Sequence, residues 1–499
     1  MTLTQWFLFF ILIQVIHFLG TWKLYQKAGR QAWEAAIPVY NAVILMKIIN
    51  RPWWWVVLLF IPIVNLIMIP VVWVETIRSF GRNSTTDTVL VILTLGLYIF
   101  YVNYALDVTY IDNRSLKPRT ATGEWINSIL FAVVAATIVH TYFIQPFTIP
   151  SSSMEKTLLV GDFLFVSKIN YGPRVPMTTV AFPMVHDTIP VLGIKSYLNW
   201  PQLPYMRLPG FEEVERNDIV VFNWPADTVP YFFYKGPKHF YKPIDKKSNY
   251  VKRAVGVAGD SLKIVNGQVY VNGQQSVLPE RARPATSYLV QGKGHGFALE
   301  QLYKRYEITD PVYMIDREKN QFGFAAIATD RIEQFKNHQN VASAIPMVDS
   351  VGHSESGMFP VYKPQGWNRD NFGPVYIPEE DATVEINPTS IPFYRRIIET
   401  YEGSDMGINN EISIRGKQVL LNGKPLTSYT FKQDYYWMMG DNRHNSEDSR
   451  YWGFVPENHI VGKPVFIWMS WDGNANGFFD SIRWERLFTT VHGEGKPVS

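Results

Sequence analysis

Residues 146–168 read PFTIPSSSMEKTLLVGDFLFVSK, and they begin directly after an uncharged apolar run, residues 126–144. Such a run has the length and composition of a membrane-spanning helix. Because an extended chain covers at most about 3.6 Å per residue, a reactive serine at positions 151–153 must stay near the membrane surface. This stretch therefore predicts serine chemistry beside a bilayer.

The first 150 residues hold most of the apolar composition, which the mean hydropathy of −0.06 over 499 residues conceals. Four stretches in this part lack charged residues, namely 6–19, 53–74, 89–106 and 126–144. Charge-free stretches approaching 20 residues predict membrane spans. We therefore expect a transmembrane module over residues 1–145, with about four spans near residues 5–20, 53–76, 88–106 and 126–145. Pro62 and Pro70 are expected to kink the second span or break it into a re-entrant pair.

Basic residues between the expected spans indicate the orientation. Five lie between the first and second spans, two between the second and third, and three between the third and fourth. The positive-inside rule places the first and third loops in the cytoplasm. Because no basic residue precedes Lys23, the first stretch differs from a cleaved signal peptide. We expect a multi-pass protein of the cell (inner) membrane, with everything after residue 144 on the extracytoplasmic side.

Charge and cysteine content exclude several function classes. A net charge of +3 gives no strong attraction to nucleic acid, so no nucleic-acid partner is predicted. The absence of cysteine excludes a thiol nucleophile, disulfides and cysteine-ligated metal. With no H-E-x-x-H motif either, we predict neither a metal nor another cofactor.

The remainder of the chain has the short, Gly- and Pro-punctuated runs that are typical of β structure. Residues 262–274 (LKIVNGQVYVNGQ) and 412–424 (ISIRGKQVLLNGK) each predict a β-hairpin followed by a second tight turn. We expect a mostly-β catalytic core in two parts, 146–280 and 411–492, around an inserted α+β subdomain, 281–410. Residues 171–215 are rich in proline and aromatics and show no clear periodicity.

Four segments carry a family resemblance when taken in order. They are IPSSSM (149–154) with Gly161-Asp162, NDIVVF (217–222), YVKRAVG (250–256) with Gly259-Asp260, and GDNRHNSEDSRYWGFVP (440–456). Following a membrane anchor, they resemble the sequence boxes of the bacterial type I signal peptidases, or leader peptidases, the Ser–Lys dyad family. This chain would be a variant with a multi-span N-terminal module and a long insertion.

The resemblance implies a membrane-bound serine endopeptidase that removes N-terminal signal peptides from exported preproteins through an acyl-enzyme. Its implied partners are preproteins and the lipid bilayer, with the protein-export machinery as a further candidate. Ser153 would be the nucleophile and Lys252 the general base. The other implied roles are oxyanion donation by Ser151 and the Ser153 N–H, positioning of the Lys252 amine by Ser446, support by Asp441, Asp448 and Arg450, and a substrate pocket lined by Ile149, Val251 and Tyr250.

The chemistry of that assignment is coherent. A serine hydroxyl attacks a peptide only when a neighbouring base removes its proton. A solvated lysine has a pKa of about 10.4, and burial lowers it toward the range in which a neutral amine is available. The apolar neighbours of Lys252 in the sequence, Val251, Ala254 and Val255, are consistent with such burial.

Two other functions and several structural roles remain open at this point. Ser153-Met-Glu-Lys156 matches the S-x-x-K signature of penicillin-binding acyltransferases, although S-D-N and K-T-G are absent. On the signal peptidase interpretation, Lys156 is expected to be a surface residue. A membrane scaffold that has lost activity is the non-enzymatic alternative. As isolated motifs, Ser152-x-x-Glu155 could be a helix-capping box, and residues 446–450 a surface turn.

Overall fold

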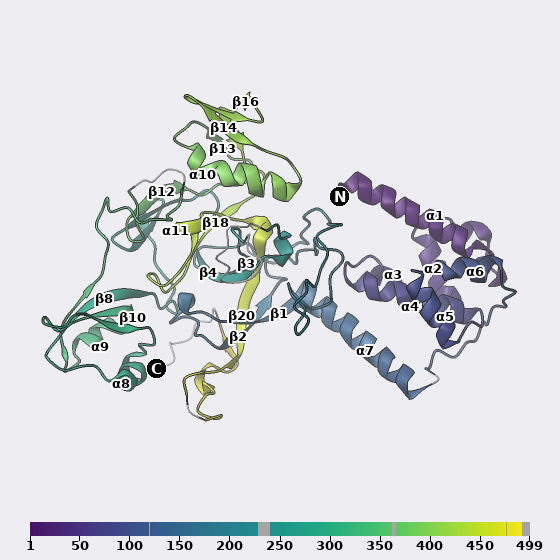
Figure 1. The fold of residues 1–499 in the computed structure, drawn as a ribbon, viewed down its shortest axis with the longest axis horizontal. Coiled ribbons are helices and arrows are strands. Elements are labelled where there is room, and N and C mark those ends of the chain that lie inside the picture. The colour runs from purple at the N-terminus through teal and green to yellow at the C-terminus, as the bar shows by residue number, and fades with distance from the viewer. Residues whose placement is uncertain (119, 228–239, 362–365, 476, 492–499) are drawn as a thin grey trace. The chain divides into compact units, whose positions relative to one another are not determined.

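The computed structural model describes residues 1–118, 120–227, 240–361, 366–475 and 477–491. The chain divides into two compact units (Figure 1). The helical unit comprises Met1–Phe143 and Arg174–Met206, and the β unit comprises Ile144–Pro173 and Arg207–Ser499.

The helical unit begins with α1 (Leu3–Lys27), whose start is fixed by a reciprocal capping box between Thr2 and Gln5. The long helix at its other end is α7 (Ala121–Ile138), which continues as a π-helical turn to Phe143. Shorter helices lie between them: α2 (Tyr40–Ile48), α3 (Trp55–Leu58), α4 (Val64–Ser79), α5 (Thr85–Leu93) and α6 (Tyr98–Tyr104).

The number of helices that could cross a membrane is smaller than the four that we predicted. Among the described residues, two are long and apolar enough, Leu3–Lys27 and Ala121–Phe143. A third is obtained only if α5 and α6, bent by 119° at their junction, count as one span. The lack of charge in a stretch describes its composition and does not show whether the chain reverses direction within it.

The predicted span 53–76 shows this difference most clearly. Helix α3 ends at Leu58 and α4 starts at Val64, so the chain turns back near Pro62. Arg51, at the start of the stretch, hydrogen-bonds to Glu75, at its end, over 2.9 Å. Residues at opposite ends of a span would lie about 30 Å apart. The stretch therefore reverses within itself at Pro62 and is not one continuous helix.

The loop between the second and third predicted spans consequently lies beside the other two loops. The four-span count requires it to lie across the membrane from them. Glu75 also bonds to Arg114 over 2.7 Å, and the Ile111 amide donates to the Ser79 carbonyl over 2.9 Å.

Residues 174–206 form an irregular antiparallel hairpin, which we call the hairpin arm. Its two sides are joined by isolated bridges that pair Thr178 with Gln202, Ala181 with Tyr197, and Thr188 with Lys195. Proline interrupts the ladder repeatedly, which explains why this stretch lacks the alternation that predicts a strand.

The β unit is built on an antiparallel sheet with strand order β1-β2-β20-β3-β4-β18-β19, in which β21 (Thr489–Thr490) also pairs with β20 (Figure 1). Strand β3 is buried along its whole length, as a central strand covered on both faces should be. The other strands are β1 (Ile144–Thr148), β2 (Asp162–Ser167), β3 (Ile219–Asn223), β4 (Asn249–Gly256), β18 (Tyr435–Met439), β19 (Val455–Pro456) and β20 (Ile460–Ser470).

Both predicted hairpins are confirmed. Strand β5 (Ser261–Val265) pairs with β6 (Gln268–Val271), and β14 (Ile412–Arg415) pairs with β15 (Gln418–Leu421). The Asn-Gly turns place both residues at positive φ, 49° and 78° at Asn266-Gly267, as their chemistry favours. The second turns lead into the short strands β7 (Gln274–Gln275) and β16 (Lys424–Pro425).

Residues 281–410 do not form the single inserted piece that we predicted. Residues 285–346 have their own sheet, order β11-β8-β10-β9, and their own hydrophobic core. Strand β12 (Phe372–Tyr376) instead pairs with β5, and α10 (Ile391–Arg396) packs into the core around Trp437. This part, which we call the inserted lobe, contains β8 (Ala285–Gly292), α8 (Leu299–Tyr306), β9 (Val312–Asp316), β10 (Gln321–Ala328), α9 (Ile332–Lys336) and β11 (Val341–Pro346).

Candidate active site

The structure brings Ser153 and Lys252 into direct contact. Ser153 lies in a short 3-10 turn, Ser152–Met154, in the loop that joins β1 to β2. Lys252 lies in the middle of β4, opposite Val220 of β3. The Lys252 Nζ donates a hydrogen bond to the Ser153 Oγ over 2.6 Å. This distance allows direct proton transfer between the two side chains.

Burial alters the acidity of this lysine. Lys252 is 3 % exposed, and loss of water lowers the pKa of its ammonium to about 8, although the Asp448 and Glu447 carboxylates act in the opposite direction. The Tyr250 ring lies 5.4 Å from Nζ and forms part of its surroundings. A lysine in this state carries an appreciable uncharged fraction near neutral pH.

The segment after β18 holds the backbone of the nucleophile in place. The Asn442 N–H donates to the Ser153 carbonyl over 3.1 Å, and the Asn442 amide donates to the Ser152 carbonyl over 3.2 Å. A Cβ on Gly440 would lie 2.5 Å from the Ser153 carbonyl oxygen and 2.6 Å from the Ser446 Cβ. Glycine is required there because two parts of the site meet at its backbone.

Two buried ion pairs support this segment. The Arg450 guanidinium donates two hydrogen bonds of 2.8 Å to the Asp448 carboxylate, and the Gly440 N–H donates a third to the same carboxylate over 3.1 Å. Burial alone would raise the pKa of Asp448, but the Arg450 charge and these bonds hold it below its ordinary value. Asp441 is paired in the same way with Arg253, over 2.8 and 2.6 Å. Bidentate geometry of this kind fixes orientation as well as charge.

The remaining predicted site residues are placed as follows. The Ser446 hydroxyl donates to the Glu447 carbonyl over 3.5 Å, and the bonds described for it do not include the Lys252 amine. Ser151 is exposed directly before the nucleophile turn. Ile149 is buried in a cluster with Met154, against which Val251 packs. The described geometry brings these residues to the nucleophile, and their roles remain predictions.

Lys156 differs from our expectation of a surface residue, because it is 2 % exposed. Its Nζ pairs with Glu155 over 3.3 Å and with Asp310 over 3.4 Å, and it also bonds to the Thr309 hydroxyl. Thr309 and Asp310 belong to the inserted lobe, more than 150 positions further along the chain. A partner that distant leaves no local signal in the sequence around Lys156.

The same lobe contributes to the site through Asp310, which sequence reasoning missed. Its second carboxylate oxygen accepts from Asn445 over 3.0 Å, and Asn445 also donates to the Ser152 hydroxyl over 2.9 Å. The lobe also meets the last sequence box directly, because the Ala285 N–H donates to the Asp441 carbonyl over 2.9 Å.

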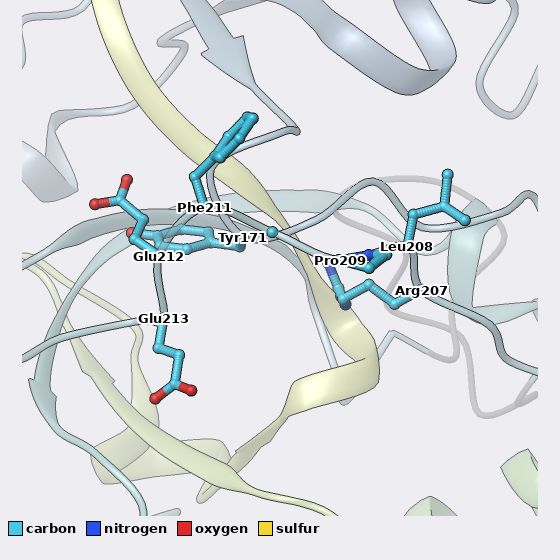
Figure 2. Close-up of a pocket in the computed structure, with 8 residues that line it drawn as sticks. Tyr171, Arg207, Leu208, Pro209, Phe211, Glu212 and Glu213 are labelled. Carbon is cyan, nitrogen blue, oxygen red and sulfur yellow. The ribbon is translucent and has the colours of Figure 1, made fainter.

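Figure 2 shows a recess of about 460 Å³ elsewhere in the β unit, lined by Tyr171 and residues 207–213. None of the predicted site residues lines it. Its polar groups are engaged in structural contacts, since the Arg207 guanidinium binds the Glu457 carboxylate over 2.9 Å and the Tyr171 hydroxyl donates to Asp218 over 2.8 Å.

Comparison with known families agrees with this geometry. The family described as "Signal peptidase, peptidase S26" matches residues 122–315 and 377–471, more than half of the chain. The chain belongs to the signal peptidase family. The unmatched gap, residues 316–376, lies within the predicted insertion.

Individual signal peptidases are similar over most of their length. Signal peptidase I of Buchnera aphidicola (subspecies Acyrthosiphon pisum) is 24 % identical over 78 % of this chain and 90 % of its own. Signal peptidase I of Haemophilus influenzae is 25 % identical over 76 % and 79 %, respectively. Signal peptidase I of Helicobacter pylori (strain 26695) is 22 % identical over 75 % and 93 %.

A second family, of unknown function and designated DUF5684, matches residues 33–113. This match covers α2 to α6, the helices between the two candidate spans, and ends before the signal peptidase match begins at residue 122. Helices α2 to α6 are therefore similar to a family other than the signal peptidases, and α1 lies outside both matches.

Proposed function

We propose that this chain cleaves signal peptides from exported preproteins with Ser153 as the nucleophile and Lys252 as the general base. Membership in the signal peptidase family makes the chain a peptidase of this class. The observation that carries the residue assignment is the 2.6 Å contact between the Lys252 Nζ and the Ser153 Oγ, made by a lysine whose pKa burial lowers to about 8.

The reaction follows from these two side chains. The neutral amine of Lys252 accepts the Ser153 proton while Oγ attacks the scissile carbonyl. The resulting oxyanion is stabilised by the Ser153 N–H and the Ser151 hydroxyl. The Lys252 ammonium then gives its proton to the departing amine, which leaves an acyl-enzyme. The regenerated amine removes a proton from water, whose oxygen attacks the ester and releases the signal peptide.

Asp448, Arg450 and Asp441 act by holding the backbone around Ser153. Ser446 shapes the site through its contact with Gly440. The substrate pocket is lined by Ile149, Val251 and Tyr250, which approach the nucleophile from β1's end and β4. Apolar side chains at these positions suit small apolar residues in front of a cleavage site.

The membrane arrangement consists of two full spans, α1 and α7, with the helices between them entering and leaving the bilayer on one side. Lys27, at the end of α1, pairs with Asp107 over 3.8 Å, and Glu75 pairs with Arg51 over 2.9 Å and with Arg114 over 2.7 Å. With the basic residues gathered at this side, the positive-inside rule makes it cytoplasmic. The start of α1 and the β unit after α7 are then extracytoplasmic.

The penicillin-binding alternative would use Lys156 as the base for Ser153. The Lys156 Nζ is instead engaged by Glu155 over 3.3 Å and by Asp310 over 3.4 Å. The amine in contact with the Ser153 Oγ is that of Lys252, so the contacts support Lys252 as the base.

The test is processing of a preprotein by purified full-length protein in detergent. Lys252→Ala and Ser153→Ala are expected to abolish cleavage, whereas Lys304→Ala, which removes an exposed lysine of α8, should retain it. Because deleting a catalytic group costs several orders of magnitude in rate, full activity in Lys252→Ala would overturn the assignment. Labelling by a fluorescent β-lactam that is lost in Lys156→Ala but kept in Lys252→Ala would support the alternative.

A further inference from the structure

The hairpin arm, residues 174–206, exposes an unusual amount of apolar surface. Val191, Leu192 and Ile194, at its tip, are 104 %, 65 % and 57 % exposed, and Trp200 is 69 % exposed. Phe182, Met184 and Leu198 add to the same surface. Soluble proteins rarely leave so many large apolar side chains uncovered in one short segment, because each contributes favourable free energy when removed from water.

Charge is almost absent from the arm. Arg174, Asp187 and Lys195 are its only residues with a formal charge, and Arg174 stands at its first position. The Lys195 ammonium lies 5.4 Å from the Tyr197 ring. Hydrogen bonds across the arm, such as those from Ile189 N–H to the Ile194 carbonyl over 2.9 Å and from Phe182 N–H to the Ser196 carbonyl over 2.7 Å, satisfy part of its backbone. A backbone bonded to itself can approach an apolar phase at lower cost.

The base of the arm contacts the end of a candidate membrane span. The Gln202 carbonyl accepts from the Trp6 indole over 2.9 Å and from the Met1 ammonium over 3.3 Å. Helix α1 has 25 residues, about 37 Å at 1.5 Å per residue, and therefore extends beyond a hydrocarbon layer of about 30 Å. Trp6, in the first turns of α1, then lies at the level where tryptophan is enriched, the membrane–water interface.

The middle of the arm also packs on the helical unit. Ala181 and Tyr197 form a buried cluster with Ile63, at the turn between α3 and α4. The contact with Trp6 therefore places the base of the arm at this interface, and the cluster with Ile63 fixes its middle to the helical unit.

We propose that the hairpin arm is a membrane-interface anchor whose tip, Val191–Ile194, inserts into the headgroup region of the outer leaflet. The occupant of its apolar surface is phospholipid of the bilayer that α1 spans, and this inference rests on the membrane placement proposed above. The arm connects β2 to β3, the strand that pairs with β4 and Lys252. It gives the catalytic sheet a second attachment to the bilayer, in addition to the link from α7 to β1.

The test uses the natural absence of cysteine. Leu192→Cys is labelled with an environment-sensitive fluorophore, and the full-length protein is reconstituted in vesicles of phosphatidylcholine and phosphatidylglycerol. The matched control is Val277→Cys, an equally apolar position that is 83 % exposed in the β unit. We expect the Leu192 label to be quenched by nitroxide placed near the lipid headgroups and to be severalfold less accessible to aqueous iodide than the Val277 label.

Equal iodide accessibility of the two labels would overturn the proposal. Protection of Leu192 from both iodide and lipid nitroxide would also overturn it, because protein, such as a second copy of the chain, would then cover the tip. These depth measurements are independent of catalysis. If wild-type protein failed to process a preprotein while Leu192 met lipid, the proposed function would fail and the anchor would stand.

A functional measurement complements the depth test. Replacing Val191, Leu192 and Ile194 together by serine should reduce cleavage of a vesicle-inserted preprotein severalfold and leave cleavage of a short soluble peptide unchanged. An equal loss on both substrates would indicate damage to the catalytic unit and would contradict the anchoring role.

Discussion

Replacing Glu447 by glutamine removes one of the two carboxylates that favour the charged form of Lys252. With a pKa of about 8, roughly one-tenth of the Lys252 amine is uncharged at pH 7 and about nine-tenths at pH 9. If the neutral amine is the base, kcat/KM of the unaltered enzyme should rise about tenfold between these pH values and then level off. An ordinary lysine would give a rise of about 100-fold over the same range, with no plateau.

The sign of the Glu447→Gln effect follows from electrostatics. The Glu447 carboxylate raises the pKa of Lys252, so its removal lowers that pKa and moves the acidic limb of the profile to lower pH. Activity at pH 7 should therefore increase. The increase has a ceiling of about tenfold, because the neutral fraction can rise only from about one-tenth to one, and activity at pH 9 should hardly change.

The assay is the initial rate of cleavage of an internally quenched peptide with small residues before the scissile bond, in detergent, from pH 6 to pH 10. Glu333→Gln, on the exposed surface of α9, is the matched control and should keep the original midpoint. A Glu447→Gln midpoint that stays in place or moves to higher pH would refute the role of Lys252 as the titrating base.

Two further variants test the packing of the site. Gly440→Ala places a methyl group 2.5 Å from the Ser153 carbonyl oxygen, so the backbone of the nucleophile must move away, and this misplacement should lower kcat by about 100-fold. Gly473→Ala, whose added methyl group meets no atom within 4 Å, is the control. Equal kcat values for the two variants would contradict the close approach at Gly440. Lys156→Met leaves Glu155 and Asp310 buried without their cation and should lower the free energy of unfolding, measured in urea, by about 3–5 kcal/mol. Lys304→Met, at an exposed ion pair, is the control and should leave that free energy almost unchanged. Equal stabilities of the two variants would show that the buried contacts contribute little.

The contacts and turns that the sequence predicts correctly are those whose signal is local. The Asn-Gly turns that flank the insertion fix their hairpins through their own backbone preferences. Ser153 and Lys252 are found because each lies in a short segment with a recognisable pattern, and the order of those segments implies that they meet. Their 2.6 Å contact was expected on that ground.

The membrane helices show why composition alone is insufficient. Residues 53–74 have the apolar content of a span, yet Arg51 and Glu75 at its two ends are bonded to each other. Hydropathy measures the free energy of transferring side chains from water to an apolar phase, and it is the same for a straight helix and for a stretch that turns back. Pro62, at the turn between α3 and α4, gave the relevant signal, because proline removes a backbone hydrogen bond that a straight helix needs; Pro70 lies inside the continuous helix α4.

The inserted lobe could not be interpreted from sequence because its contacts with the nucleophile segment are all long-range. Ala285, the first residue of β8, is hydrogen-bonded to the backbone of both Asp441 and Arg443. Between these two residues lies Asn442, whose N–H donates to the Ser153 carbonyl. On the opposite side of this segment, Asp310 links the Asn445 amide to the buried Lys156 ammonium. An appended domain that only added bulk would need none of these bonds. Because they bond to the segment whose Asn442 holds the Ser152 and Ser153 carbonyls, we expect that a loosened lobe reduces turnover before it reduces substrate binding.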